Sequence, residues 1–288
     1  MGRRDAKLVR SLDPMHVIVP LLYPGRCDNE AYISERIDLT NINEYLKKKN
    51  ENLAPEEDGD VFRYSLFHLI VCAMMKTLKL RPKMNWFIAN GRIYERNKVT
   101  SSFVVKKKFA DNGAEALAFL EGEDGDTIDT VREKIRSQIY VARSDKLDSS
   151  TESMDFISKL PFWLVRFVVW ACRKLDVHGK VPKDFVASDP YYTSIVLSNL
   201  GSIKLKSGYH HLTNWGTNSA IVIIGEKKIR PYFQPDGTFT MRDSVELGIT
   251  IDERIADGYY YSKSIRLLKT LLENPELLET PLSEEVDY

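Results

Sequence analysis

Apolar and polar residues follow two different periods in the first part of the chain. Residues 32–39 alternate, with Ile33 and Ile37 on one face and polar side chains on the other. A period of two predicts a strand that is buried on one side only. Residues 61–80 instead carry apolar side chains around most of a helical circumference, and Pro82 follows them. This second pattern predicts a largely buried helix.

Helical spacing recurs in the rest of the chain. It predicts a short helix through residue 49, which begins at the capping-box spacing of Asn41 and Glu44. The Asn274-Pro275 pair marks the end of the last helix. Longer helices are predicted within residues 126–142, 160–175 and 265–272.

Two turn sequences separate runs of strand-forming residues. The Asn90-Gly91 pair precedes a long run at 92–109 and is a strong hairpin signal. The Pro-Asp-Gly sequence at 235–237 predicts a second hairpin. Because strands and helices are mixed without regular alternation, we expect an α/β two-layer sandwich with a mixed sheet. Buried central strands are expected at the apolar runs 192–197 and 220–224.

The composition narrows the class of protein. The 288 residues include 41 Lys and Arg and 41 Asp and Glu, so no overall charge favours nucleic acid. The chain lacks Gly-rich phosphate loops and metal-ligand spacings, so we expect no metal. Cys27, Cys72 and Cys172 are widely spaced, as is typical of buried thiols in a reducing compartment. The apolar runs are shorter than the ~20 residues that cross a bilayer, so we expect a soluble cytoplasmic protein.

An unusual aromatic stretch, FWLVRFVVWACRKL, occupies residues 162–175. Arg166, Arg173 and Lys174 stand among its Trp and Phe residues. This mixture is typical of a helix that lies on a membrane surface. The same residues would also suit a helix packed in the core or at a subunit interface, and the sequence leaves these alternatives open.

Three segments occur in the order and spacing of a known family. They are RPKMNWFIANGRIYERNKVTSSFVVKK (81–107), VLSNLGS (196–202) and DERIADGYYYSKSIRLLKTLLENPELL (252–278). With them, the chain resembles the catalytic domain of the dihydrolipoyl acyltransferases of 2-oxo acid dehydrogenase complexes, which is similar in fold to chloramphenicol acetyltransferase. The resemblance implies a single acyltransferase-like domain over residues 14–280, a C-terminal tail at 281–288, and no lipoyl or linker segment.

The family's signature is His-Arg-x-x-Asp-Gly, and the matching positions are Glu253, Arg254, Asp257 and Gly258. In the family, the histidine is the general base that takes a proton from an acceptor thiol or hydroxyl during attack on an acyl thioester. The aspartate is structural and holds the turn. The resemblance therefore puts Glu253 in the catalytic base position, with Asp257 supporting it and Arg254 and Gly258 beside the substrate.

A carboxylate in the base position changes the chemistry. The unperturbed pKa of a glutamate is ~4.3, against ~6.5 for histidine, and a base works best when its pKa lies near the working pH. A glutamate there would need burial that raises its pKa by about two units. Three interpretations stay open: Glu253 is the base, another residue replaces it, or Glu253 forms a salt bridge to Arg254 or Arg26 in a protein that has lost this chemistry.

Two adjacent histidines are candidates for a replacement acid or base. His210 and His211 stand in HHLTNWG, which differs from the related signature HHxxxDG because Trp215 occupies the aspartate position. They precede the strand expected at 220–224 and not the last helix, so they are outside the family's base position. One of them, more readily His211, would line the channel. The alternative is a pair of loop histidines bonded to backbone or solvent.

The SNLG segment contributes a further candidate. The resemblance implies that Ser198 supplies a hydroxyl to the tetrahedral oxyanion, an interaction worth ~3 kcal/mol when it is preorganised. The alternative is a strand-end serine that caps the turn before Gly201. Asn199 is expected to set the turn geometry beside the substrate.

In the resembled family, the active site is a channel at a subunit interface that coenzyme A and the acyl carrier enter from opposite ends. The resemblance therefore implies a homotrimer in which Glu253 of one chain faces Ser198 of the next. We expect a coenzyme A-linked acyltransferase that moves an acyl group from a thioester to a thiol or hydroxyl acceptor, which is a small molecule or carrier-bound. Acyl-coenzyme A is the expected substrate. The alternative is a non-catalytic homologue that binds a thioester or assembles with a partner enzyme.

Overall fold

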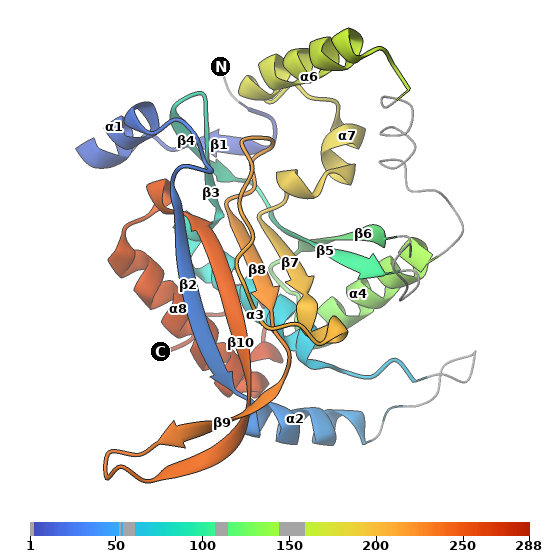
Figure 1. Cartoon of the computed structure of the whole chain (residues 1–288), viewed down its shortest axis with the longest axis vertical. Coiled ribbons are helices and arrows are strands. Elements are labelled where there is room, and N and C mark those ends of the chain that lie inside the picture. Colours follow the sequence, from blue (N-terminus) through green and yellow to red (C-terminus); the bar gives the residue numbers. More distant parts are fainter. Residues whose placement is uncertain (1–2, 52, 54–60, 107–114, 144–158) are drawn as a thin grey trace.

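The computed structural model describes residues 3–51, 53, 61–106, 115–143 and 159–288 (Figure 1). The helices are α1 (Pro14–Leu22), α2 (Thr40–Asn50), α3 (Leu66–Leu80), α4 (Ile128–Arg143), α6 (Phe162–Val177), α7 (Lys183–Ser188) and α8 (Gly258–Glu273). The strands are β1 (Ala6–Leu8), β2 (Glu30–Asp38), β3 (Trp86–Ala89), β4 (Arg92–Arg96), β5 (Val99–Lys106), β6 (Glu115–Gly122), β7 (Ile195–Asn199), β8 (Ala220–Ile224), β9 (Lys228–Phe233) and β10 (Phe239–Asp252).

A seven-stranded mixed sheet forms the centre of the molecule. Its strands run in the order β2-β10-β8-β7-β5-β6, and β9 pairs with the first half of β10. β7 is parallel to both of its neighbours, β5 and β8, and the other pairs are antiparallel. All five residues of β8 are buried, which explains the unbroken apolar run at this position.

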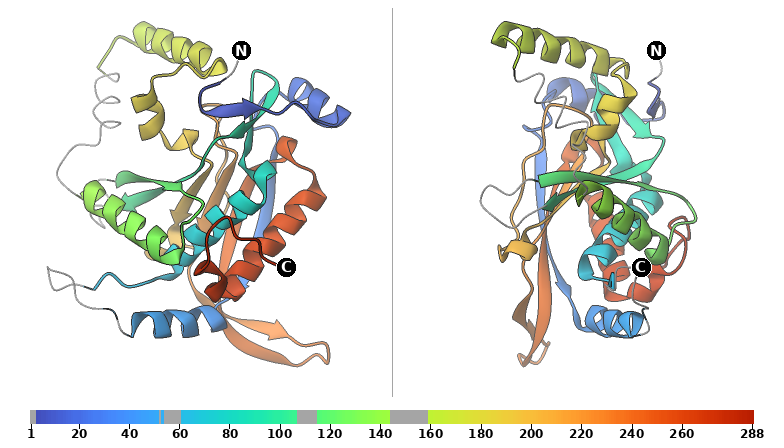
Figure 2. Two further views of the ribbon diagram at one scale, coloured as in Figure 1. Left: turned by 180° about the vertical axis from the view of Figure 1, so that it is seen from behind. Right: turned by 90° about the vertical axis from the view of Figure 1, so that its right-hand side faces the viewer.

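Helices cover one face of this sheet. α3, α4 and α8 lie side by side on that face (Figure 2), and the buried residues of α3 and α8 belong to the main hydrophobic core. The opposite face is crossed by the loop that follows β7. A side chain at Gly248 of β10 would meet the carbonyl oxygen of Gly208 at 1.9 Å, so glycine allows the loop to pass this close. The α/β two-layer fold with a mixed sheet is therefore confirmed.

A smaller sheet, in the order β1-β4-β3, lies beside the large one. β3 and β4 form the hairpin predicted from Asn90 and Gly91, which both have left-handed backbone angles (φ 50° and 66°). The single strand predicted over residues 92–109 was wrong. It divides at residues 97–98 into β4, in the small sheet, and β5, in the large one.

Two predicted helix starts were also wrong. No side chain caps the start of α2. The side-chain amide of Asn41 (Nδ2) donates instead to the carbonyl oxygen of Glu273 at 2.8 Å. α3 begins at residue 66, because Ser65 and His68 form a capping box there. The buried His68 is therefore a hydrogen-bonded residue of the core.

Both ends of the chain contact the body of the molecule. β1, which precedes the predicted domain start at residue 14, pairs with β4. Leu282, in the predicted tail, is buried, and its amide donates to the carbonyl oxygen of Asp126 at 2.9 Å.

The cysteines differ from expectation, since only Cys72 is buried. None of the described helices combines the length and apolar character that crossing a bilayer requires.

Candidate functional site

The Glu253 position lies in the connection between β10 and α8. β10 ends at Asp252, whose amide donates to the carbonyl oxygen of Ser219 at 3.0 Å. A single 3-10 turn, Glu253–Ile255, follows, and α8 begins at Gly258. Asp257 caps α8 by accepting a hydrogen bond from the Tyr260 amide at 2.8 Å. The connection is thus fixed at both ends by hydrogen bonds.

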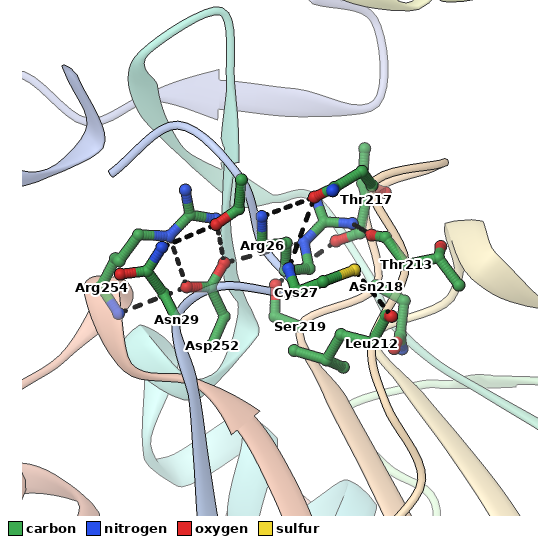
Figure 3. A network of polar contacts seen from close by, with 12 residues as sticks. Arg26, Cys27, Asn29, Leu212, Thr213, Thr217, Asn218, Ser219, Asp252 and Arg254 are labelled. Carbon is green, nitrogen blue, oxygen red and sulfur yellow. Dashed lines mark hydrogen bonds and ion pairs between the residues drawn. The ribbon is translucent and has the colours of Figure 1, made fainter. Parts of the chain in front are cut away.

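A buried ion pair holds the middle of this turn (Figure 3). Asp252 is fully buried and accepts two hydrogen bonds from the Arg254 guanidinium, Nε to Oδ1 at 2.7 Å and Nη2 to Oδ2 at 2.6 Å. A paired, bidentate geometry of this kind is strong and directional. Arg254 also donates from Nη1 to the carbonyl oxygen of Tyr23 at 2.6 Å, which ties the turn to the end of α1.

Arg26 adds a second buried cation to this ion pair. Its Nε lies 3.7 Å from Asp252 Oδ2, and Nη1 donates to the carbonyl oxygen of Thr213 at 2.7 Å. Nη2 donates to the carbonyl oxygen of Gly216 at 3.2 Å. Burial lowers the pKa of Arg26, and the Asp252 carboxylate opposes that shift. Arg26 therefore fixes the loop before β8 against the Asp252 turn.

Glu253 itself is oriented differently from its two neighbours. Its amide donates to the carbonyl oxygen of Asn29 at 3.0 Å, whereas its side chain is exposed in the single chain. No ion pair of Glu253 occurs among the residues that the structure describes. The two arginines proposed as its salt-bridge partners, Arg26 and Arg254, are paired with Asp252 instead. The backbone of Glu253 is fixed while its carboxylate stays accessible.

The remaining motif positions differ in accessibility. Arg254 is buried and its guanidinium is fully engaged, which suits a role in holding the turn better than contact with substrate. Gly258 is exposed, and a side chain added there would meet nothing within 4 Å. Gly258 therefore leaves open the approach to the first turn of α8.

The two histidines lie at the same end of the sheet as Glu253. His210 and His211 stack with ring centroids 4.7 Å apart, and each Nδ1 is bonded to the next backbone carbonyl oxygen. The Leu212 amide donates to the Glu30 carboxylate. Glu30 pairs with Asp252 across the sheet. Both imidazoles are thus exposed and lie on a loop near the Asp252 turn. Each contacts one backbone carbonyl oxygen.

Ser198 lies away from Glu253 within one chain. The strand register pairs Ser198 with Ile223, and Ile223 with Gly248. Glu253 follows Gly248 by five residues, which is roughly 16 Å along the strand, and two strand spacings add about 10 Å across the sheet. Ser198 and Glu253 of the same chain therefore cannot act on one substrate atom. The adjacent Asn199 uses its side-chain oxygen to accept from the Ser202 amide at 3.2 Å, as expected of a turn-setting residue.

Two hollows flank the Asp252–Gly258 connection. One, of about 550 Å³, lies between β2 and α8 and is lined by residues that include Ile33, Ile251 and Gly258. The other, of about 400 Å³, lies on the Arg254 side, with Trp215 among its lining residues. Both are large enough for a small ligand or an extended chain.

The sequence of the last part of the chain matches a family model. Residues 186–280 match the model described as the catalytic domain of the 2-oxoacid dehydrogenases acyltransferase. No curated protein matches the chain.

Solved structures share the fold over nearly the whole chain. A probable dihydrolipoamide acetyltransferase from Listeria monocytogenes is 16% identical, with 98% of each chain covered and a TM-score of 0.61. The dihydrolipoamide acetyltransferase of Azotobacter vinelandii is 15% identical, with 94% of each chain covered and a TM-score of 0.60. A chloramphenicol acetyltransferase is 14% identical, with 93% of this chain and 99% of that chain covered and a TM-score of 0.57.

These likenesses confirm the resemblance. The chain has the fold shared by chloramphenicol acetyltransferase and the dihydrolipoyl acyltransferases, and its C-terminal part matches the catalytic-domain model of the latter. Within the matched segment, glutamate stands at position 253, where the motif of that family has its histidine.

Three residues that hold the turn were not predicted from the sequence as parts of the site. Asp252 is one residue from Glu253, yet its sequence position does not show that it is the buried partner of Arg254. Arg26 was considered only as a partner of Glu253, and Asn29 carries no motif. The charged sequence Asp-Glu-Arg was the one available signal, and it does not reveal which carboxylate points inward.

Proposed function

We propose that this protein is a coenzyme A-linked acyltransferase that uses Glu253 as its general base. The observation that carries the proposal is the turn: Asp252 and Arg254 hold the backbone rigidly from inside, while the Glu253 carboxylate between them remains accessible. A base must be positioned by groups that do not themselves react. This arrangement supplies that positioning.

In the proposed reaction, the Glu253 carboxylate takes the proton of an acceptor thiol or hydroxyl. The acceptor sulfur or oxygen then forms a bond to the acyl carbonyl carbon of acyl-coenzyme A. The Ser198 hydroxyl donates to the oxyanion of the tetrahedral intermediate. The carbon–sulfur bond to coenzyme A breaks as the carbonyl reforms, and the proton held by Glu253 passes to the coenzyme A thiolate. Atoms and charge balance, and no metal or further cofactor takes part.

The register within one chain supports a site shared between chains. Because Ser198 and Glu253 of the same chain are too far apart, the serine that serves Glu253 must come from a second copy. We propose a homotrimer in which each Glu253 faces Ser198 of the next chain. The second copy would also bury the carboxylate, which is exposed in a single chain.

The two hollows provide routes to the shared site. We propose that the pantetheine arm of coenzyme A and the acceptor approach the Asp252–Gly258 connection from opposite sides. Gly258, which lines the larger hollow, leaves room for one of them. His210 and His211 would line the approach. The contact of each Nδ1 with a backbone carbonyl favours the tautomer in which Nε2 is the basic nitrogen, so His211 stays the candidate for a replacement base.

We further propose one catalytic domain over residues 14–280 that acts in the cytoplasm. An acceptor thiol must remain reduced, and the three free cysteines suit a reducing compartment.

The alternative function is a non-catalytic homologue that binds a thioester or assembles with a partner enzyme. The replacement of the family's histidine by glutamate favours it. One experiment separates the two. Purified protein is mixed with acetyl-coenzyme A and dihydrolipoamide or a small alcohol, and release of free coenzyme A is measured together with coenzyme A binding. Turnover supports the transferase, whereas binding without turnover supports the alternative.

Replacement of Ser198 by alanine is expected to lower kcat by about 100-fold, because the oxyanion loses a preorganised donor. KM for acyl-coenzyme A should change little, since the hydroxyl is needed mainly in the transition state. The matched control is Ser202→Ala, an exposed serine in the turn that follows β7. Equal kcat for wild type and Ser198→Ala would remove Ser198 from the mechanism.

Sedimentation should show a species with three times the mass of one chain at micromolar concentration. A stable trimer is expected because α1 exposes a run of apolar side chains, among them Met15, Ile18 and Leu21, that a monomer would leave in water. A protein that is active while sedimenting as a single chain would contradict the shared site.

A further inference from the structure

Helix α6 stands apart from the hydrophobic core. None of its 16 residues is buried. The helix lies at the end of the molecule opposite the β9–β10 hairpin (Figures 1 and 2). Core packing, one of the three alternatives left open by the sequence, is therefore excluded for this helix.

The inner side of α6 is nevertheless anchored at its C-terminal end. Asp176 is half-buried and forms an ion pair with Arg3, Oδ1 to Nη2 at 3.1 Å. The Arg3 guanidinium in turn lies 5.1 Å from the ring centre of Phe87 in β3. This anchor sets which side of the helix faces the protein and which side faces outward.

The outward side combines aromatic and basic residues. Trp163, Phe167 and Trp170 are 70%, 57% and 56% exposed, and the rings of Phe167 and Trp170 stack. Three exposed cations, Arg166, Arg173 and Lys174, lie on the same side at helical spacing. We call these six residues the aromatic–basic face.

The described residues do not neutralise the charge of this face. None of its three cations has an ion pair or hydrogen bond within the described part of the chain, and no exposed carboxylate stands among them on α6. The whole chain, by contrast, carries as many acidic as basic residues. An uncompensated cluster of cations beside exposed Trp side chains is complementary to anionic phosphates at the boundary of an apolar layer.

We infer that the aromatic–basic face binds the surface of an anionic phospholipid bilayer. The helix, about 24 Å long, would lie flat, with its Trp and Phe rings at the headgroup level and its three cations on lipid phosphates. A two-fold contact between copies of the chain suits this face less well, because two identical faces would bring like charges together. Membrane binding is distinct from the acyl transfer proposed above, since α6 supplies neither Glu253 nor Ser198, although Arg173 also lines the smaller hollow.

The test is sedimentation of the full-length protein with vesicles of phosphatidylcholine alone or mixed with phosphatidylserine. Binding to the mixed vesicles is expected to be on the order of a hundredfold tighter, from three cations that each contribute about fivefold. Trp fluorescence should shift to shorter wavelength on binding, as the indoles leave water. Binding should weaken steeply as salt is raised.

Two double variants test the two components of the face. Trp163→Ala with Trp170→Ala should lower binding at least ~10-fold through loss of buried apolar area. Arg166→Glu with Lys174→Glu should abolish the preference for phosphatidylserine. The matched control is Phe233→Ala with Phe239→Ala, an exposed aromatic pair at the far end of the molecule, which should bind like the wild type.

Three results would overturn the inference. They are wild-type protein that ignores phosphatidylserine vesicles, variants of the face that bind as tightly as the wild type, and a tryptophan variant that sediments as a smaller oligomer without vesicles. The last result would identify the face as a contact between copies of the chain. Thermal unfolding of each variant confirms that it is folded, and little change is expected for exposed positions.

Discussion

Replacement of Asp252 by alanine is expected to lower the free energy of unfolding by about 3–5 kcal/mol. The substitution leaves two buried guanidinium groups, Arg26 and Arg254, without their shared carboxylate. Each would have to stay charged without a counterion or draw water into the turn. Urea denaturation at neutral pH, compared with the wild type, measures the loss.

The residue next in sequence provides the matched control. Glu253→Ala removes a carboxylate from the same turn, but an exposed one, so its effect on unfolding should stay within about 0.5 kcal/mol. Asp252→Asn keeps the shape of the side chain and removes only the charge, so an intermediate loss is expected. Equal stability of Asp252→Ala and Glu253→Ala would show that the buried ion pair does not hold the turn.

Replacement of Glu253 by alanine is expected to lower kcat by about 10²–10⁴-fold, which is the usual contribution of a positioned general base. The fold should be unaffected, because the stabilising contacts of this residue are made by its backbone amide. The measurement is steady-state release of coenzyme A from acyl-coenzyme A in the presence of dihydrolipoamide. The unfolding comparison above shows whether lost activity reflects lost structure.

The variant Glu253→His distinguishes a glutamate that serves as the base from a scaffold that has lost the transferase activity. If wild type and Glu253→His both turn over while Glu253→Ala does not, a base is required at this position and the carboxylate serves as one. If only Glu253→His turns over, the scaffold is intact and the natural protein is not this transferase. Full activity of Glu253→Ala would transfer the role of base to another group, with His211→Ala as the next variant to examine.

Local sequence patterns predicted most of the elements that surround the site. The strand at 32–39, the turn at Asn90-Gly91 and the final helix all follow from side-chain period and turn chemistry, which depend on neighbours a few residues apart. Side-chain period and turn chemistry gave a wrong prediction at residues 92–109, where a single strand was expected. Nothing within that run shows that its two halves join different sheets, because the division depends on partners in β1 and β7.

The sequence motif predicted where the candidate site lies along the chain, but it did not predict which side chains of the site point inward. The spacing of Glu253, Arg254, Asp257 and Gly258 identified the turn from the sequence alone. Asp252 is the carboxylate that faces inward, where it pairs with Arg254 and also lies near Arg26, more than two hundred residues away along the chain. A local pattern cannot encode such a contact, since it forms only when the start of β2 is brought beside the end of β10.

By itself, the sequence of this protein determined the fold class, the position of the candidate turn and the glutamate in place of histidine. The tertiary structure alone decided that Asp252, and not Glu253, binds the buried arginines, and that Ser198 of the same chain is out of reach. It also decided that the aromatic face of α6 points outward. Each of these depends on which surfaces meet in three dimensions, because burial and ion pairing are properties of packed neighbours and not of residue order.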